Sequence, residues 1–333
     1  MRFAVVGAGV IGEVHARLIA SLPDEAELVA VVDLDQSRAA AIAATSGGEA
    51  MNELEKACAR EDVDAVSICL PSGAHAAAAI TALRAGKHVV VEKPLDVTLA
   101  AADRLIDVER ETGLTVAVIS QRRFQHASAF VHQAIADGKL GRITAGIAES
   151  AFWRSQEYYD SGGWRGTRAL DGGGALMNQG IHVVDLLLWM MGEPVEVQAY
   201  ADRLAHERID VEDTVAATVR FRSGAIGSIL ATTSAYPGRP VRLSVYGDRG
   251  SAVIEHEDLA YFHTADGDPA FGPSDSLSVD DAHREQYLDF IHAVRDARRP
   301  LIGTQDARRA LEVVLGVYES ARTGRPVQLT GRE

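Results

Sequence analysis

The sequence predicts an α/β protein with a doubly wound parallel sheet first and an α+β domain with a large open, mostly antiparallel sheet after it. Up to about residue 122, short apolar runs alternate with Ala-rich stretches, which is typical of buried parallel strands joined by helices. Later, one strand pattern follows another across short turns such as Arg222–Ala225, which indicates antiparallel pairing. We therefore expect one domain over 1–122 and a second over 123–333, with the C-terminal helices able to pack back on the first.

The first domain is expected to consist of five strands and the helices between them. The strands are the near-continuous apolar runs Phe3–Val6, Leu28–Val32, Ala65–Leu70, His88–Val91 and Thr115–Ile119. Stretches rich in helix formers separate them, at Glu13–Ser21, Arg38–Thr45, Ala74–Ala85 and Leu99–Thr112.

The second domain is expected to begin with a helix, Phe124–Asp137, that stops at Gly138. A strand and a long helix follow, at Ile143–Phe152 and from about Gly174 to Met191. The later strand patterns are Val195–Arg203, Thr214–Arg222, Ala225–Ser234, Val241–Tyr246 and Ala252–Glu255. The segment Thr264–Asp281, rich in Gly, Pro, Ser and Asp, reads as a mobile loop. Helices at Ala282–Ala297 and Thr304–Thr323 end the chain.

The composition excludes several classes of protein. The net charge is −14, from 47 acidic and 33 basic residues, which argues against a nucleic-acid or anionic-membrane surface. The two cysteines, Cys58 and Cys69, form neither a disulfide framework nor a paired metal motif. The N-terminus leads directly into a strand pattern without a signal peptide, and no apolar run is long enough to span a bilayer. We expect a cytoplasmic protein.

A glycine-rich turn joins the first strand to the first helix. The turn, Gly7-Ala8-Gly9-Val10-Ile11-Gly12, allows backbone N–H groups to approach a pyrophosphate at the helix N-terminus, as in Rossmann domains. Asp33 ends the second strand 21 residues beyond Gly12, at the spacing of a residue that binds ribose hydroxyls. Its charge would repel a 2′-phosphate, so NAD is expected rather than NADP. Leu34 and Arg38 follow; Arg38 can stack on adenine, neutralise a phosphate, or be a solvated surface residue.

The segment Asn178–Asp185 places polar groups on a helix that is otherwise apolar. Asn178, His182 and Asp185 are spaced four and three residues apart, so they form one line beside the apolar stripe of Met177, Ile181, Val184, Leu188 and Met191. Gly180 costs about 1 kcal/mol relative to Ala in a helix, which suggests a close approach at this point. The line is suited to lining a crevice, although a polar helix edge that touches solvent would give the same pattern.

Six pieces of sequence together resemble the glucose–fructose oxidoreductase / inositol dehydrogenase / rhizopine-catabolism (Gfo/Idh/MocA) family. They are GAGVIG, the LPSGAH segment after the third strand, EKP after the fourth, QRRF from Gln121, WRGT from Trp164, and DGGGALMNQGIHVVD from Asp171. The resemblance covers nearly the whole chain. Each piece alone is weak, but their combination and order are specific.

The resemblance implies a Rossmann domain, then a sheet domain that often forms a dimer or tetramer interface, so we expect a homodimer or homotetramer. Lys93 and His182 match the catalytic lysine and histidine of the family. Tyr287 sits where a late tyrosine in some relatives reaches the cofactor. The residues that match the dinucleotide lining are Leu70, Pro71, Ser72, His75, Glu92, Lys93, Gln121, Trp164 and Arg165.

These residues suit the oxidation of a secondary alcohol. A histidine with an ordinary pKa of about 6.5 supplies neutral base at pH 7, so His182 is the expected general base. Lys93 would hold the substrate oxygen and stabilise developing negative charge. Many relatives carry Asp in place of Asn178; an amide cannot take a proton, so Asn178 is expected to orient substrate hydroxyls. Asp185 either orients the imidazole or makes a buried structural hydrogen bond.

The loop Trp153–Thr167 carries two Trp, two Tyr and two Arg, a composition that suits a sugar ring bearing a carboxylate or phosphate. An interface or lid loop would have the same composition. With Asn178 and His182, we expect Arg123, Trp153 and Arg154 to bind a carbohydrate-like substrate. No sequence spacing indicates a metal site.

The sequence therefore predicts an NAD-dependent dehydrogenase acting on a sugar, cyclitol or sugar acid. Two alternatives stay open, an NAD-dependent glycosidase that uses transient oxidation and a non-enzymatic NAD- or sugar-sensing regulator. The presence of both Lys93 and His182 weighs against the regulator, and the acidic charge weighs against one that binds DNA directly.

Overall fold

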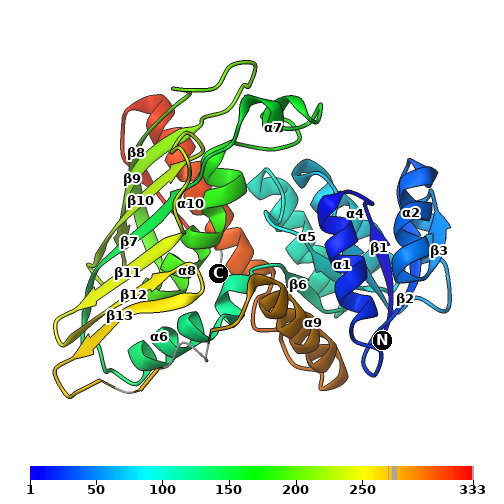
Figure 1. Ribbon diagram of the computed structural model, residues 1–333, viewed down its shortest axis with the longest axis horizontal. Helices are drawn as coiled ribbons and strands as arrows, with labels where there is room; N and C mark the ends of the chain where they lie inside the picture. Colours follow the sequence, from blue (N-terminus) through cyan, green and yellow to red (C-terminus); the bar gives the residue numbers. More distant parts are fainter. Residues whose placement is uncertain (269, 272–275, 332–333) are drawn as a thin grey trace. The chain divides into compact units, whose positions relative to one another are not determined.

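The computed structural model describes residues 1–268, 270–271 and 276–331. The chain divides into two compact units (Figure 1). Unit 1 comprises Met1–Ser120 and His283–Arg308, and unit 2 comprises Gln121–Ala282 and Arg309–Glu333. The helix Val279–Arg295 (α9) and the helix Thr304–Thr323 (α10) each contribute residues to both units.

Unit 1 is built on a six-stranded parallel sheet of order β3-β2-β1-β4-β5-β6, which confirms the predicted doubly wound fold. The strands are β1 (Arg2–Val6), β2 (Glu27–Val32), β3 (Glu49–Met51), β4 (Ala65–Ile68), β5 (His88–Val91) and β6 (Val116–Val118). The edge strand β3 was not predicted, since three residues are too few to show a periodicity. The strand order places the carboxyl ends of β2, β1, β4 and β5 side by side.

Five helices connect these strands, and part of α9 joins their core. The helices are α1 (Val10–Ala20), α2 (Gln36–Ser46), α3 (Leu54–Cys58), α4 (His75–Arg84) and α5 (Leu99–Thr112). Phe3 of β1 meets Tyr287 of α9 edge to face, with ring centroids 5.6 Å apart. Both residues are fully buried, so a segment from near the end of the chain completes the core of the first fold unit.

Unit 2 contains an eight-stranded sheet of order β13-β12-β11-β7-β10-β9-β8-β14, in which the pair β7–β10 is parallel and the other pairs are antiparallel. This confirms the large, mostly antiparallel sheet. The strands are β7 (Ile143–Ala151), β8 (Pro194–Asp202), β9 (Thr214–Phe221), β10 (Ile226–Thr232), β11 (Arg242–Gly247), β12 (Gly250–Glu255), β13 (Asp258–Thr264) and β14 (Val327–Gln328). The sequence patterns missed β13 and β14.

One face of this sheet packs on the helix Ile181–Met191 (α8) (Figure 1). The approach is close: a β-carbon on Gly146 of β7 would lie 2.2 Å from the sulfur of Met191. Unit 2 also contains α6 (His126–Ala136), the short helix α7 (Gln156–Asp160) and a 3₁₀ turn, Gln121–Phe124. The opposite face of the sheet leaves Ile147, Tyr200 and Leu230 exposed.

The regular helix predicted from Gly174 is wrong over its first part. Leu176–Gly180 forms a π turn, and the α-helix begins only at Ile181. A π turn inserts an extra residue into a helix, and a pattern of apolar residues gives no sign of it.

In the described part of the chain, no helix combines the length and the apolar character needed to cross a bilayer. The loop predicted over Thr264–Asp281 includes residues 269 and 272–275, which lie outside the described residues.

Candidate functional site

The three glycines of the first turn are required for different reasons. Gly7 has φ +101°, and a β-carbon there would lie 2.3 Å from the carbonyl oxygen of Cys69. A β-carbon on Gly12 would lie 1.8 Å from the carbonyl oxygen of Gly7. Around Gly9, by contrast, no described atom lies within 4 Å of the β-carbon position. Packing of the chain therefore explains Gly7 and Gly12, while Gly9 leaves open space in front of α1.

This open space fits a pyrophosphate. Gly9 precedes α1 without a side-chain cap, so the first N–H groups of the helix need acceptors from elsewhere. A helix N-terminus with such groups attracts an anion. Val10, in the first turn, is exposed, and Ile11 is partly exposed. The residues present therefore fit the dinucleotide that the glycine spacing predicts.

Asp33 lies at the end of β2, beside the glycine turn. Its Oδ2 accepts the N–H of Ala8 at 2.7 Å, and its Oδ1 accepts the N–H of Asp35 at 2.9 Å. These bonds orient the carboxylate, and each oxygen keeps a second lone pair that can accept from a ribose hydroxyl. Leu34 is almost fully exposed. The exposed Arg38 lies 3.5 Å from the Asp35 carboxylate, so its role toward a cofactor stays open.

The segment Leu70–His75 follows β4 and is linked to the loop after β5. The buried His75 ring places Nδ1 at 2.6 Å from the carbonyl oxygen of Pro94 and Nε2 at 2.8 Å from that of Leu70. Burial lowers the pKa of His75, so the neutral ring donates only one of these bonds at a time. Pro71 and Ser72 lie in the loop that this ring supports.

A buried polar network lies under the glycine turn. Glu92, at the end of β5, places Oε1 at 3.1 Å from Nε2 of His15, and its Oε2 accepts the N–H of Lys93 at 3.0 Å. On its other side, Nδ1 of His15 lies 2.9 Å from the hydroxyl of Ser67 and 2.8 Å from that of Tyr287. His15, Ser67 and Tyr287 are fully buried. The Tyr287 hydroxyl is thus engaged inside unit 1, and an effect on a cofactor would pass through His15 and Ser67.

The two members of the central pair shift each other's pKa. Burial alone would lower the pKa of His15, but Cys69 and the Glu92 carboxylate raise it to about 10. Burial alone would raise the pKa of Glu92, but the hydrogen bond and charge of His15 hold it well below its usual range. Both shifts favour the charged forms, so the contact between His15 and Glu92 is interpreted as an ion pair.

His283 of α9 joins this pair, so that one donor atom from each of His15, Glu92 and His283 lies within 4.8 Å of the others. Histidine and carboxylate donors are typical ligands of zinc. However, His15 and Glu92 are at hydrogen-bonding distance, which is the arrangement of an ion pair. The expectation that the protein has no metal stays a prediction, and sequence spacing could not have found this cluster because its members are far apart in the chain.

In unit 2, the π turn is held at its start by Glu212. The buried Glu212 carboxylate accepts the N–H groups of Gly174 at 2.8 Å and Leu176 at 2.9 Å. The hydroxyl of Tyr318 donates to the same carboxylate at 2.9 Å and accepts the N–H of Met177 at 3.1 Å. Gly174 has no space for a side chain, since its β-carbon would lie 1.7 Å from the carbonyl oxygen of Glu212. No sequence motif marks Glu212 or Tyr318, so neither residue was predicted.

Asn178 and His182 are partly exposed on a segment that is otherwise mostly buried. The Asn178 amide donates through Nδ2 to Asp171 at 2.9 Å, and the other oxygen of Asp171 accepts the N–H of Gly166 at 2.8 Å. This orients the amide. The close approach predicted at Gly180 is confirmed: a β-carbon there would lie 3.0 Å from that of Ala231 on β10.

Asp185, the third member of the predicted polar line, is buried and pairs with Arg123. Its carboxylate accepts from Nε of Arg123 at 2.8 Å and from Nη2 at 2.6 Å. The Arg123 guanidinium also lies 5.3 Å from the Trp189 ring. This buried ion pair orients Arg123; that Arg123 also binds a substrate stays a prediction.

The remaining predicted residues of unit 2 lie on two segments. Gln121 is buried, and its Oε1 has no hydrogen-bond partner among the described residues. Trp153 is partly exposed and meets Tyr236 edge to face at 5.4 Å. Arg154 and Arg165 both lie over Tyr158, and Arg165 also lies 4.6 Å from the ring of Trp164.

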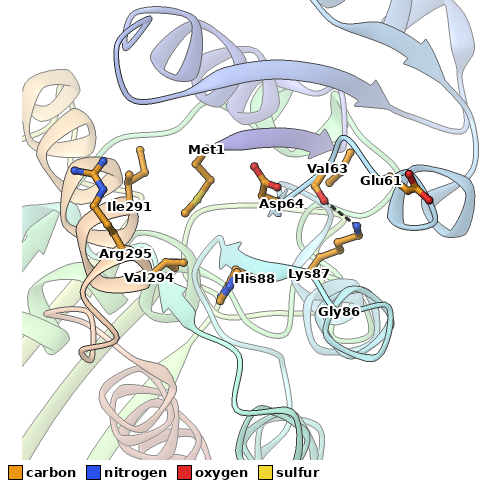
Figure 2. A pocket seen from close by; sticks show the side chains of 10 residues that line it. All are labelled: Met1, Glu61, Val63, Asp64, Gly86, Lys87, His88, Ile291, Val294 and Arg295. Carbon is orange, nitrogen blue, oxygen red and sulfur yellow. Dashed lines mark hydrogen bonds between the residues drawn. The ribbon is translucent and has the colours of Figure 1, made fainter.

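A cavity of about 550 Å³ in unit 1 has none of these residues in its lining (Figure 2). Its lining includes Met1, Asp64 and His88 at the amino ends of strands, and Ile291 of α9 (Figure 2). Lys87 donates to the carbonyl oxygens of Arg60 and Val63, both at 2.8 Å. Ligands of open parallel sheets bind at the carboxyl ends of the strands, so this cavity is not the dinucleotide site.

Comparison with known proteins agrees with this arrangement. Residues 1–120 match the model of an oxidoreductase family with an NAD-binding Rossmann fold, and residues 129–253 match the GFO/IDH/MocA C-terminal domain. The WlbA dehydrogenase from Bordetella pertussis, whose crystal structure is a complex with NADH and UDP-GlcNAcA, is 32% identical. The match covers 100% of this chain and 99% of that one, with a TM-score of 0.90.

Two curated relatives are similar over most of their length. The 4-carboxy-2-hydroxymuconate-6-semialdehyde dehydrogenase of Sphingobium sp. is 29% identical, over 90% of this chain and 92% of its own. The scyllo-inositol 2-dehydrogenase (NAD(+)) of Bacillus subtilis is 28% identical, over 99% and 96%. The predictions of an oxidoreductase and of NAD as its cofactor are confirmed.

Two glycine variants test whether Gly9 leaves space for a pyrophosphate while Gly12 is required by packing. Gly9→Ala should change the free energy of unfolding by about 0.5 kcal/mol or less, because its β-carbon meets nothing in the protein. It should nevertheless weaken NADH binding about tenfold or more, because it fills the pyrophosphate space. Gly12→Ala should instead cost about 1–3 kcal/mol or more of stability through overpacking. Denaturant unfolding and NADH fluorescence titration measure both effects; a Gly9→Ala protein that binds NADH like the parent would contradict this reading.

The His15–Glu92 pair predicts a pH-dependent contribution to stability. Because the pKa of folded His15 is raised from 6.5 to about 10, its contribution is complete below pH 6.5 and is lost as the pH rises toward 10. The lowered pKa of Glu92 makes its contribution complete above its ordinary pKa of 4.5. His15→Gln should therefore cost about 3–5 kcal/mol near pH 6 and less at pH 10.

Denaturant unfolding of the parent, His15→Gln and the control His292→Gln, a more exposed histidine on α9, measures this difference at several pH values. A cost that is the same from pH 6 to pH 10 would rule out a charged His15.

Proposed function

Because this chain belongs to the Gfo/Idh/MocA family of NAD-binding oxidoreductases, we propose that it oxidises a secondary alcohol of a sugar, cyclitol or sugar acid, with His182 as general base and Lys93 as oxyanion stabiliser. The observation that carries this proposal is the placement of partly exposed Asn178 and His182 on a buried segment that Glu212 clamps. A π turn and a buried carboxylate both cost free energy of folding, and such costs are found where a segment has to present functional side chains.

The chemistry divides among few groups. A nicotinamide cofactor held at the glycine turn would supply the hydride acceptor for the alcohol carbon. A ring nitrogen of neutral His182 takes the proton of the substrate hydroxyl. In the reverse direction, the imidazolium of His182 returns this proton to the substrate oxygen. The ammonium of Lys93 stabilises negative charge on the substrate oxygen. The Glu92 carboxylate, held by His15, accepts the backbone N–H of Lys93 and so orients that residue at the end of β5.

Asn178 is proposed to orient the substrate through its amide. The bond from Nδ2 to Asp171 fixes the orientation of the amide, which is partly exposed on the segment that carries His182. The names of the relatives are consistent with cyclic polyols or sugar derivatives, since an inositol dehydrogenase and a dehydrogenase solved with UDP-GlcNAcA are among them. We propose NAD over NADP because of the Asp33 carboxylate, and the cytoplasm because both cysteines are buried and unpaired.

We further propose that the outer face of the eight-stranded sheet binds a second copy of the chain. Strand register places Glu149, Leu230, Ala216 and Tyr200 in one row on this face. Tyr200 is 81% exposed and Leu230 36%, and Ile147 and Ile226 are exposed on the same face. A two-fold axis would cover these apolar side chains on both copies at once.

Substitution of the two catalytic candidates should lower turnover far more than cofactor binding. His182→Ala should lower kcat by about 10²–10⁴-fold and Lys93→Met by about 10²–10³-fold. Reduced-nicotinamide absorbance across a panel of monosaccharides, inositols and sugar acids measures turnover, and fluorescence titration measures NADH binding. The controls are His263→Ala and Lys56→Met, both exposed and paired with carboxylates.

Variants that turn over an identified substrate as fast as the parent would refute these roles. Glycan cleavage without net NADH would indicate the glycosidase instead. Tight NADH binding with no turnover in the whole panel would favour the sensor.

Charges on the outer sheet face should break the proposed oligomer. Leu230→Glu and Tyr200→Glu should shift the mass measured by light scattering toward the monomer, because each places a carboxylate in an apolar contact. The control is Leu204→Glu, an exposed leucine after β8 and outside the sheet. Equal masses for the parent and both sheet variants would argue against this interface.

A further inference from the structure

Two arginines of unit 2 lie against one tyrosine ring. The guanidinium carbon of Arg154 is 4.9 Å from the centroid of Tyr158, and that of Arg165 is 4.5 Å from it. Among the described residues, no carboxylate forms an ion pair with either guanidinium, whereas many other arginines of this acidic chain have one. Nε of Arg154 is buried and has no hydrogen-bond partner in the described structure.

The backbone holds this cluster in place. Arg154 donates its N–H to the carbonyl oxygen of Thr233, and its own carbonyl oxygen lies 2.8 Å from Nε2 of His206. The other ring nitrogen of His206 lies 3.0 Å from the buried carboxylate of Asp213. Beneath the loop, Tyr159 packs in a small apolar cluster with two aliphatic residues, and Tyr158 packs against it. The backbone of Arg154 and the Tyr158 ring, which both arginines contact, are therefore held in place by hydrogen bonds and packing.

The cluster adjoins the segment that carries the catalytic candidates. The hydroxyl of Tyr158 accepts from Nη1 of Arg165 at 2.9 Å and faces Nε2 of Gln179 at 3.4 Å. Gln179 is the neighbour of Asn178 in the π turn. Its side chain is buried, and its Oε1 has no partner among the described residues. Asp171 provides a second link, since it binds both Gly166, next to Arg165, and Asn178.

Two neighbouring positive charges without a local acid raise the free energy of the protein, and a bound anion would lower it. Guanidinium forks match the oxygens of carboxylates and phosphates. We propose that Arg154, Tyr158 and Arg165 form a subsite for an anionic group, a carboxylate or a phosphate, of the sugar substrate. Gln179 Oε1 accepts from a hydroxyl of the same molecule. The assignment rests on the proposed function, because it names the substrate class of that site.

The experiment measures binding to the NADH-loaded protein by calorimetry, with D-glucose, D-glucuronate, D-glucose 6-phosphate and UDP-glucuronate as probes. At least one anionic probe should bind about tenfold or more tightly than D-glucose. Preference for glucuronate would identify a carboxylate, and preference for the phosphate probes would identify a phosphate.

Arg154→Gln and Arg165→Gln should each lose about tenfold or more in affinity for that anionic probe and little for D-glucose. Arg154→Lys, which keeps the charge without the fork, should lose less than Arg154→Gln. The matched control Arg322→Gln removes an exposed arginine paired with Glu319 and should change nothing. Thermal unfolding confirms that each variant folds.

Equal affinities for neutral and anionic probes would overturn the subsite. So would arginine variants that bind NADH more weakly but the sugars as before, since the cluster would then serve the dinucleotide, as the family resemblance implies for Arg165. Turnover separates the two proposals. Turnover is measured separately with NAD⁺ in place of NADH. Binding of an anionic probe that depends on Arg154, without turnover of that probe or of the wider panel of sugars, inositols and sugar acids, would refute the dehydrogenase and keep the subsite; turnover without anion preference would do the reverse.

Discussion

The buried pair of His15 and Glu92 is the interaction on which the ligand-binding edge of the parallel sheet depends. It joins α1, which carries the glycine turn, to the loop after β5, which carries Lys93. Through Ser67 and Tyr287 it also joins β4 and α9. A buried ion pair has a large desolvation cost, and only close geometry with further hydrogen bonds offsets it. None of these four segments can therefore move independently, so one pair positions both the phosphate-binding turn and the catalytic lysine candidate.

Unit 2 uses a carboxylate in a similar way. Glu212 binds backbone N–H groups on both sides of Ala175, where the chain enters the π turn. Burial raises the pKa of Glu212, which shows that its position is costly for a charged group. A π turn is itself less favourable than an α-helix and is often found at functional sites. The unusual backbone and the buried carboxylate together fix where Asn178 and His182 emerge.

The fold and the glycine turn could be predicted because their signals are local. Apolar runs mark the parallel strands, and the spacing of Gly7, Gly9 and Gly12 within six residues marks the turn, although the contact that requires Gly7 is with the distant Cys69. The π turn could not be predicted, because an inserted residue leaves the apolar pattern of α8 intact. Partners distant in sequence were also missed: Arg123 and Asp185 are 62 residues apart, and His15 and Tyr287 are 272 apart. The sequence gives the number and positions of the charged residues, but it does not show which of them form ion pairs in the folded protein.

That distinction separates the arginines of this protein into two groups. Arg123 is buried and paired with Asp185, and Arg308 is similarly paired with Asp103. Arg154 and Arg165 lie in a basic and aromatic stretch of sequence. In the structure their guanidinium groups contact the Tyr158 ring and no carboxylate of the described residues. In a chain with a net charge of −14, carboxylates are abundant, yet none of the described ones forms an ion pair with either of these two cations on a single tyrosine ring. Such departures are expected where a ligand completes the interaction, because the missing charge then belongs to the ligand.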